Sequence, residues 1–181
     1  MKYCQQIVLK NGKTVILRNG EESDGSAVLE NFNLTHTETD SLLSYPDENS
    51  FDPEKESQFL KQKAESTNEV EIIAFVDGKG VGTAGISAVG TKYKVRHRAE
   101  FGVGVRKEYW GLGIGGALLE ACINCAKEAG YTQLELSVVA ENDRAIALYQ
   151  KAGFIEYGRN PCGFHSRING FQEIVYMLLE L

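Results

Sequence analysis

The spacing of apolar and polar residues divides the chain into a series of predicted strands and helices. Strands are expected where apolar residues alternate with polar ones or where β-branched residues gather: residues 14–20, two runs within 69–89, then 97–105, 132–140, 154–159 and 173–181. Helices are expected where the pattern follows the helical period: residues 23–36, 52–66, 113–130 and 142–153. The acidic stretch between the first two helices is expected to be a loop.

Cap and turn residues mark several of these boundaries. Asp52 followed by Pro53 is typical of a helix start, because the carboxylate accepts a free backbone N–H and proline tolerates the first helical position. Asp77-Gly78 separates the two runs of 69–89, which predicts a hairpin. Gly130 is expected to end the third helix.

The order of these elements is β-α-α-β-β-β-α-β-α-β-β. The strand, helix and strand of residues 97–140 form a βαβ unit, so these two strands should be parallel, whereas the remaining connections resemble hairpins. The predicted fold class is α/β (α+β): a mixed, mostly antiparallel sheet with one central parallel pair and helices on both faces.

Length and charge narrow the range of functions. A chain of 181 residues with 43% apolar content is expected to form a single domain, residues 1–181. The net charge of −6 argues against a nucleic-acid partner, which would select a basic face. No apolar run is long enough to span a bilayer and the first residues do not resemble a signal peptide, so we expect no membrane partner and a cytoplasmic location.

The pair Cys122 and Cys125 has the C-x-x-C spacing of redox motifs and zinc sites. Both cysteines lie on the apolar stripe of the helix expected at 113–130, and no second Cys or His pair lies at ligand spacing. We therefore expect reduced cysteines in the core and no metal site.

The strand expected at 97–105 has two unlike faces. One is apolar and carries Ala99, Phe101, Val103 and Val105. The other carries Glu100, Gly102 and Gly104. Glycine weakens a strand, so two in register indicate either close approach of a ligand or a bulge or tight helix packing.

A glycine-rich loop, YWGLGIGGALL (109–119), leads from this strand into the next helix, where backbone N–H groups form an anion site. Gly111, Gly113 and Gly116 match the dinucleotide pattern G-x-G-x-x-G. However, RKEYW separates the strand from the first glycine, and no acidic residue closes the next strand. The Walker pattern is absent too, so the sequence favours another kind of phosphate loop.

The segment NDRAIALYQKAGF (142–154) identifies the loop. It resembles the signature N-x-x-A-x-x-L-Y-x-x-x-G-F of the GNAT superfamily of N-acetyltransferases. In that family it follows an acetyl-CoA pyrophosphate loop, Q/R-x-x-G-x-G/A. The corresponding segment here is WGLGIG, with Gly113 and Gly115 in the glycine places and Trp110 in place of Gln or Arg. The resemblance covers about residues 97–160, which become the expected cofactor-binding core.

The resemblance implies acetyl-CoA (coenzyme A) as the cofactor and a parallel pair that splays to admit its pantetheine arm. Backbone of the strand would contact the arm, and backbone of the loop would hold the pyrophosphate. The implied cofactor-binding residues are Phe101, Gly102, Val103, Gly104, Val105, Trp110, Gly111, Leu112, Gly113, Ile114, Gly115, Gly116, Asn142 and Tyr149. Arg106 and Lys107 are open candidates for CoA contacts, whereas a solvated position is favoured for Arg144.

Amine acetylation requires a base, because an alkyl amine with a pKa of about 10 must lose a proton before it attacks a thioester. Glu100 is the candidate base, directly or through a water, and Tyr149 is the candidate acid toward the sulfur. A backbone N–H near Val103 is the candidate oxyanion donor. The alternatives are a core position for Tyr149 and an ion pair of Glu100 with Arg98 or His97.

The resemblance places the acceptor between the loop after the first helix and the loop between the last two strands, here residues 35–53 and 160–173. Glu38 and Tyr45, together with Glu100, are the candidate substrate residues, because carboxylates beside an aromatic ring suit a cationic amine. A solvated acidic loop is equally compatible with this segment.

The function expected from these features is direct acetyl transfer from acetyl-CoA to a primary amine of a small molecule or peptide. Two alternatives remain: a CoA-binding sensor or scaffold without catalysis, and an NAD-dependent oxidoreductase. A homodimer is left open, since dimers are common in the family.

Overall fold

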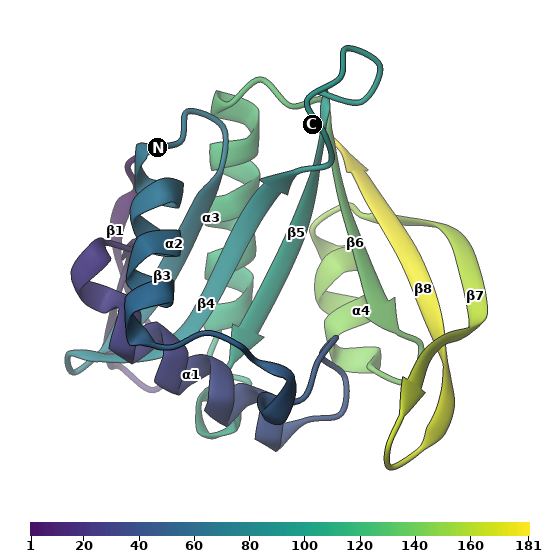
Figure 1. The fold of residues 1–181 in the computed structure, drawn as a ribbon, viewed down its shortest axis with the longest axis horizontal. Helices are drawn as coiled ribbons and strands as arrows, with labels where there is room; N and C mark the ends of the chain where they lie inside the picture. Colours follow the sequence, from purple (N-terminus) through teal and green to yellow (C-terminus); the bar gives the residue numbers. More distant parts are fainter.

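The computed structural model describes residues 1–181 and contains one eight-stranded sheet with helices on both faces (Figure 1). The strands are β1 (Cys4–Val8), β2 (Thr14–Asn19), β3 (Val70–Val76), β4 (Lys79–Ala88), β5 (Arg98–Val105), β6 (Gln133–Val139), β7 (Ile155–Ser166) and β8 (Gly170–Glu180). The α-helices are α1 (Gly25–Glu38), α2 (Pro53–Glu65), α3 (Ile114–Glu128) and α4 (Asp143–Lys151). The strand order is β1-β2-β3-β4-β5-β6-β8-β7, and only β5 and β6 pair in parallel, which confirms the predicted fold class.

Each face of the sheet is covered by one pair of helices. In Figure 1, α1 and α2 lie in front of the sheet, and α3 and α4 lie behind it. In front, Val28 and Leu60 pack on Ile73 of β3. The larger core lies behind and includes Leu118 of α3 and Phe101 of β5. Because side chains alternate along β5, Glu100 and the glycines of this strand face the front.

Local signals placed several elements correctly. The Asp52 carboxylate accepts a hydrogen bond from the Lys55 backbone N–H at 2.9 Å, as expected of the cap of α2. Asp77 and Gly78 have φ values of 50° and 79° and join β3 to β4 as the predicted hairpin. Cys122 and Cys125 are unpaired and buried in α3, as predicted.

Two expectations about the strands are wrong. Strand β1 was not predicted, because it is an edge strand whose residues are mostly exposed, so it has no apolar alternation. β7 extends to Ser166, so most of the loop expected at 160–173 is a hairpin of β7 and β8. Here the pairing with β8 overrides the local Pro161 and glycine signals, with register shifts that accommodate them.

The parallel pair separates toward its carboxyl ends. Residues 98–100 of β5 pair with 133–135 of β6, and no pairing follows. Figure 1 shows the two strands diverging below this point. None of the helices has the length and apolar character needed to cross a bilayer.

Candidate active site

A cleft of about 950 Å³ lies where β5 and β6 diverge. Its walls are β5, the glycine loop, the starts of α3 and α4, part of β6 and the segment after α1. All but one of the cofactor-binding residues expected from the sequence line this cleft. The exception is Leu112, whose side chain packs against the core behind the sheet.

The backbone of β5 offers hydrogen-bonding groups to the cleft. The Arg106 N–H donates to Val81 and the Val89 N–H donates to Arg98, so the even-numbered residues of β5 bond to β4. In an antiparallel pair the alternate residues point their N–H and C=O groups the other way. Phe101, Val103 and Val105 therefore direct theirs toward the gap beside β6. Of the two glycines between them, Gly102 faces open space, since a methyl group there would meet no atom within 4 Å, whereas one at Gly104 would contact Thr35 at 3.6 Å.

The glycine loop turns sharply into α3. Gly111 and Gly113 have φ values of 79° and 105°, in the left-handed region that favours glycine. Gly113 is the N-cap of α3, and its carbonyl accepts the first helical hydrogen bond from Ala117. The N–H groups of the first turn, residues 114–116, have no partner within the helix and lie at the cleft. This arrangement is an anion site.

Trp110, which stands at the Gln or Arg position of the pyrophosphate motif, contacts an arginine from α4. Its Nε1 donates to the Val105 carbonyl at 2.6 Å, which fixes the ring against the end of β5. The Arg144 guanidinium lies 3.7 Å from the ring centroid, a close cation–π contact. Both side chains line the cleft, so a positive charge stands beside the phosphate loop.

Two other basic residues near the loop are placed differently. Arg106 is 8% exposed, and its guanidinium donates to Asn31 and Glu30 of α1. It therefore ties α1 to the end of β5 and does not face the cleft. Lys107 is exposed, and its backbone N–H donates to the Glu38 carboxylate at 2.7 Å.

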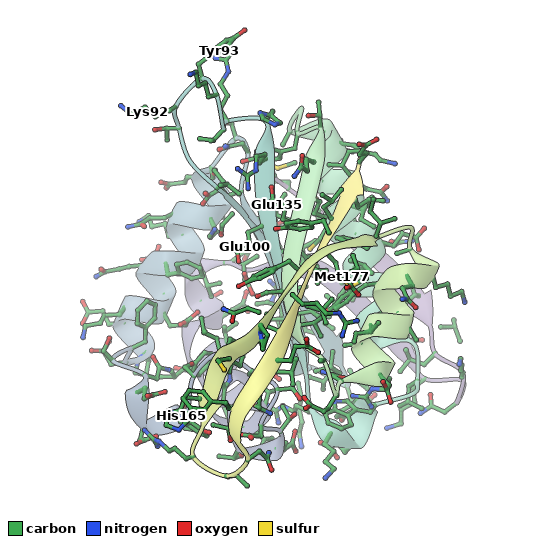
Figure 2. The ribbon with its side chains drawn as sticks, turned by 90° about the vertical axis from the view of Figure 1, so that its right-hand side faces the viewer. Lys92, Tyr93, Glu100, Glu135, His165 and Met177 are labelled. Carbon is green, nitrogen blue, oxygen red and sulfur yellow. The ribbon has the colours of Figure 1, made fainter.

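Glu100 projects from β5 without an ion-pair partner. The expected alternative, a pair with Arg98, is wrong, because Arg98 donates to both carboxylate oxygens of Glu135 on β6. Figure 2 shows Glu100 and Glu135 on these neighbouring strands. Glu100 is exposed and lines the cleft, so its carboxylate is free to interact with a ligand.

Tyr149 lies on the opposite side of the gap, on α4. Its ring packs edge-on against Phe101 and tilted against Phe154, with centroids 6.2 and 5.9 Å away. The side chain is 7% exposed, and its burial raises the pKa of the phenol to about 12. The sequence is compatible with a core position and with a position at the cofactor site for Tyr149. The structure shows both, since the side chain packs in the core and lines the cleft.

Asn142 caps α4 and also lines the cleft. Its side-chain oxygen accepts a hydrogen bond from the Ala145 N–H at 3.2 Å, so the Asn of the motif has a structural role here. The amide nitrogen is left for other partners.

The acceptor side differs from expectation. Glu38 is absent from the lining of the cleft, since its carboxylate is held by the Lys107 N–H. Tyr45 lies in a smaller adjoining cavity, where its hydroxyl donates to Asp40. The cleft is instead lined there by residues that the sequence did not single out: Thr35, Thr39, Ser41, Leu42, Leu43, Ser137 and Phe164. They carry no motif, and only the approach of distant segments brings them together.

Comparison with known proteins agrees with this geometry. Residues 33–154 match the family model described as the acetyltransferase (GNAT) family. A segment of 55 residues is 46% identical to mycothiol acetyltransferase of Paenarthrobacter aurescens (strain TC1), but it covers 30% of this chain and only 17% of that protein.

Solved structures resemble the whole chain. A GNAT-family acetyltransferase from Streptococcus pneumoniae has 30% sequence identity and a TM-score of 0.88, over 92% of this chain and 99% of that one. Ribosomal-protein-alanine N-acetyltransferase from Brucella melitensis has 27% identity and a TM-score of 0.78, over 91% and 99%. The yncA protein of Salmonella typhimurium, solved with its cofactor acetyl-CoA, shares the fold at 19% identity and a TM-score of 0.80, over 92% and 94%.

The fold and the cleft define an acyltransferase that uses acetyl-CoA. The chain belongs to the GNAT acetyltransferase family. The alternative interpretation, a dinucleotide-binding loop of an NAD-dependent oxidoreductase, is therefore wrong.

Proposed function

We propose that the protein transfers an acetyl group from acetyl-CoA directly to a primary amine, and that Glu100 and Tyr149 carry the proton transfers. The observation that carries this proposal is their placement. Glu100 and Tyr149 lie on opposite sides of the β5–β6 gap and line the same cleft. The carboxylate of Glu100 and the hydroxyl of Tyr149 form no ion pair or hydrogen bond with the protein.

The residues of the cleft fit CoA. The free N–H groups of the first turn of α3 and the Arg144 guanidinium suit the negative charges of the phosphates. The outward backbone of Phe101, Val103 and Val105 suits an extended arm that pairs like an added strand, although the Val105 carbonyl is already used by Trp110. We infer that Arg144 supplies the charge that the loop lacks at Trp110, in place of the solvated position favoured by the sequence.

The chemistry then follows from the positions of three groups. When bound, acetyl-CoA supplies the acyl group as a thioester. Glu100 would take a proton from the acceptor nitrogen, directly or through a water. The Val103 N–H would donate a hydrogen bond to the carbonyl oxygen, and Tyr149 would give its proton to the sulfur. The buried cysteines take no part, because burial raises the pKa of the Cys125 thiol to about 11 and that of Cys122 as well.

An amine acceptor is supported from two sides. Glu100 and Asp40, which enter no ion pair with a basic side chain, lie at the front of the cleft and in the adjoining cavity, where they favour a cation. The Brucella relative is named for acetylation of ribosomal-protein alanine, which supports transfer to nitrogen in a similar fold.

Calorimetry with acetyl-CoA, followed by a thiol-release assay over small and peptide amines, tests this function. We expect binding, and CoA release that requires an amine and yields an acetylated product by mass spectrometry. Binding without release for any amine would favour the alternative, a CoA-responsive sensor or scaffold. Absence of binding would contradict both.

A further inference from the structure

A second cavity adjoins the cleft on its acceptor side. It has a volume of about 230 Å³ and lies between the segment after α1 and the β7–β8 hairpin. Leu42, Leu43 and Phe164 line both spaces, so the two adjoin at these side chains. A molecule with one end at Glu100 would pass these side chains to place its other end in this hairpin cavity.

The hairpin cavity contains a polar group without a partner. Gln172 of β8 lines it, is 7% exposed, and its Oε1 accepts no hydrogen bond. It is the only buried side-chain polar atom of the whole chain in this condition. Burial of an unpaired amide oxygen is destabilising, so such an atom calls for a donor that the protein itself does not provide.

Asp40 places a negative charge in the same cavity. Its Oδ2 accepts from Ser166 and Asn169, whereas its Oδ1 accepts from Tyr45 alone at 2.9 Å. A carboxylate oxygen can accept two hydrogen bonds, so one position on Oδ1 remains open. These hydrogen bonds, that of Ser166 foremost, hold the pKa of Asp40 below its usual range.

No basic side chain neutralises this charge. Arg167, on the turn of the same hairpin, pairs with Asp47 and Glu48 and stacks on the ring of Tyr45. His165 stacks on Phe171 at a centroid distance of 4.5 Å. The negative charge of Asp40 is thus not balanced within the cavity, and this suits a positively charged donor that reaches Asp40 Oδ1 and Gln172 Oε1.

We propose that the hairpin cavity binds a second cationic nitrogen of the acceptor, held by Gln172 Oε1 and Asp40 Oδ1 while the reacting nitrogen lies at Glu100. The acceptors are then diamines or other dibasic compounds rather than simple monoamines. This inference rests on the proposed function, because it assigns the far end of the same substrate.

Binding to the CoA-saturated protein tests the subsite without relying on turnover. The probes are α,ω-diaminoalkanes of increasing length, each paired with its matching n-alkylamine. We expect the best diamine to bind about 10-fold or more tightly than its monoamine. It should also shift the side-chain amide resonance of Gln172 in ¹H–¹⁵N spectra, a signal assigned by its loss in Gln172→Met.

Three variants separate binding from folding. Gln172→Met and Asp40→Asn should each bring the affinities for diamine and monoamine close together while acetyl-CoA affinity stays unchanged. Gln172→Met should not lower the melting temperature, because it removes an unpaired polar atom and keeps the length of the side chain. Gln6→Met, an exposed position on β1, is the matched control and should keep the preference.

The subsite would be overturned if diamines and monoamines bind with equal affinity, or if no diamine shifts the Gln172 resonance. Either result would leave acetyl-CoA binding and acetyl transfer to monoamines intact. Failure of acetyl-CoA to bind would contradict the proposed function instead. The amine titration of the free protein would still report on Gln172.

Discussion

The guanidinium of Arg144 lies 3.7 Å from the centre of the Trp110 ring, and Trp110 is in turn held to the end of β5 by its Nε1. Trp110 stands in the motif position usually taken by Gln or Arg. The ring cannot carry charge, but it places the charge of a residue 34 positions later in the chain beside the same loop. The departure from the motif and the arginine of α4 are therefore parts of one arrangement.

Arg144→Ala should weaken CoA binding by about 10-fold or more, because a charge-assisted contact to phosphate is lost. Calorimetry measures the affinity, and Trp110, the single tryptophan of the chain, reports binding by its fluorescence. Acetyl-pantetheine has no nucleotide phosphates, so its affinity should not change. The matched control is Arg96→Ala, which removes an arginine stacked on Tyr93 in the β4–β5 loop. Equal CoA affinities of Arg144→Ala and wild type would remove Arg144 from the phosphate site.

Tyr149→Phe should lower kcat by about 100-fold and leave acetyl-CoA affinity nearly unchanged, because the ring keeps its packing on Phe101 and only the proton donor is lost. The pKa of about 12 keeps the phenol protonated through neutral pH, as an acid requires. Single-turnover kinetics isolate the chemical step. An unaltered single-turnover rate would assign Tyr149 to packing alone.

Glu100→Gln should reduce turnover by about 100-fold, with the largest loss at low pH, where more of the acceptor amine is protonated and a base matters most. The pH profile of kcat/KM is the measurement. Glu120→Gln, an exposed carboxylate on α3, is the control. A loss that is the same at every pH would argue against a proton role for Glu100.

Glu71 of β3 predicts a pH dependence of stability. Its carboxylate lies over Gly85 of β4, where a methyl group would collide with it, and burial raises its pKa from 4.5 to about 7. The folded protein therefore binds this proton more tightly than the unfolded chain does. The stabilisation is complete below pH 4.5 and is lost as pH rises through about 7.

Glu71→Gln should accordingly raise the free energy of unfolding at pH 8 by about 1–2 kcal/mol and leave this free energy nearly unchanged at pH 4.5. The expected gain is reduced to this size because the side chain is partly exposed. Urea unfolding at the two pH values measures this difference. Glu54→Gln on the exposed face of α2 should show no such dependence. If the difference in unfolding free energy between Glu71→Gln and wild type is the same at pH 8 and pH 4.5, the Glu71 carboxylate is solvated in the folded protein.

Thiol reactivity should divide the cysteines into two pairs. Cys4 and Cys162 are exposed and should react with Ellman's reagent in the native protein, whereas Cys122 and Cys125 are buried with raised pKa values and should react only after unfolding. Native reaction of all four cysteines would show that α3 opens readily.

Agreement between sequence and structure is best where the signal is local. The cap at Asp52, the turn at Asp77-Gly78 and the helix after Gly113 depend on backbone conformation within a few residues, so they could be recognised without the fold. Strand β1 and the second half of β7 depend on a partner strand for their hydrogen bonds. Their residues are largely exposed and leave no periodic pattern to recognise.

The sequence alone determined most of the elements, the parallel pair, the phosphate loop and the family signature, because each depends on the spacing of neighbouring residues. Only the tertiary structure decided which side chains are free to act. Glu100 is free because Arg98 turns to Glu135, and Arg144 reaches the cleft because Trp110 holds it. The unpaired Gln172 lines a cavity that forms only where the hairpin meets the segment after α1. Such pairings join residues far apart in the chain, and they depend on strand register and packing, which local periodicity does not encode.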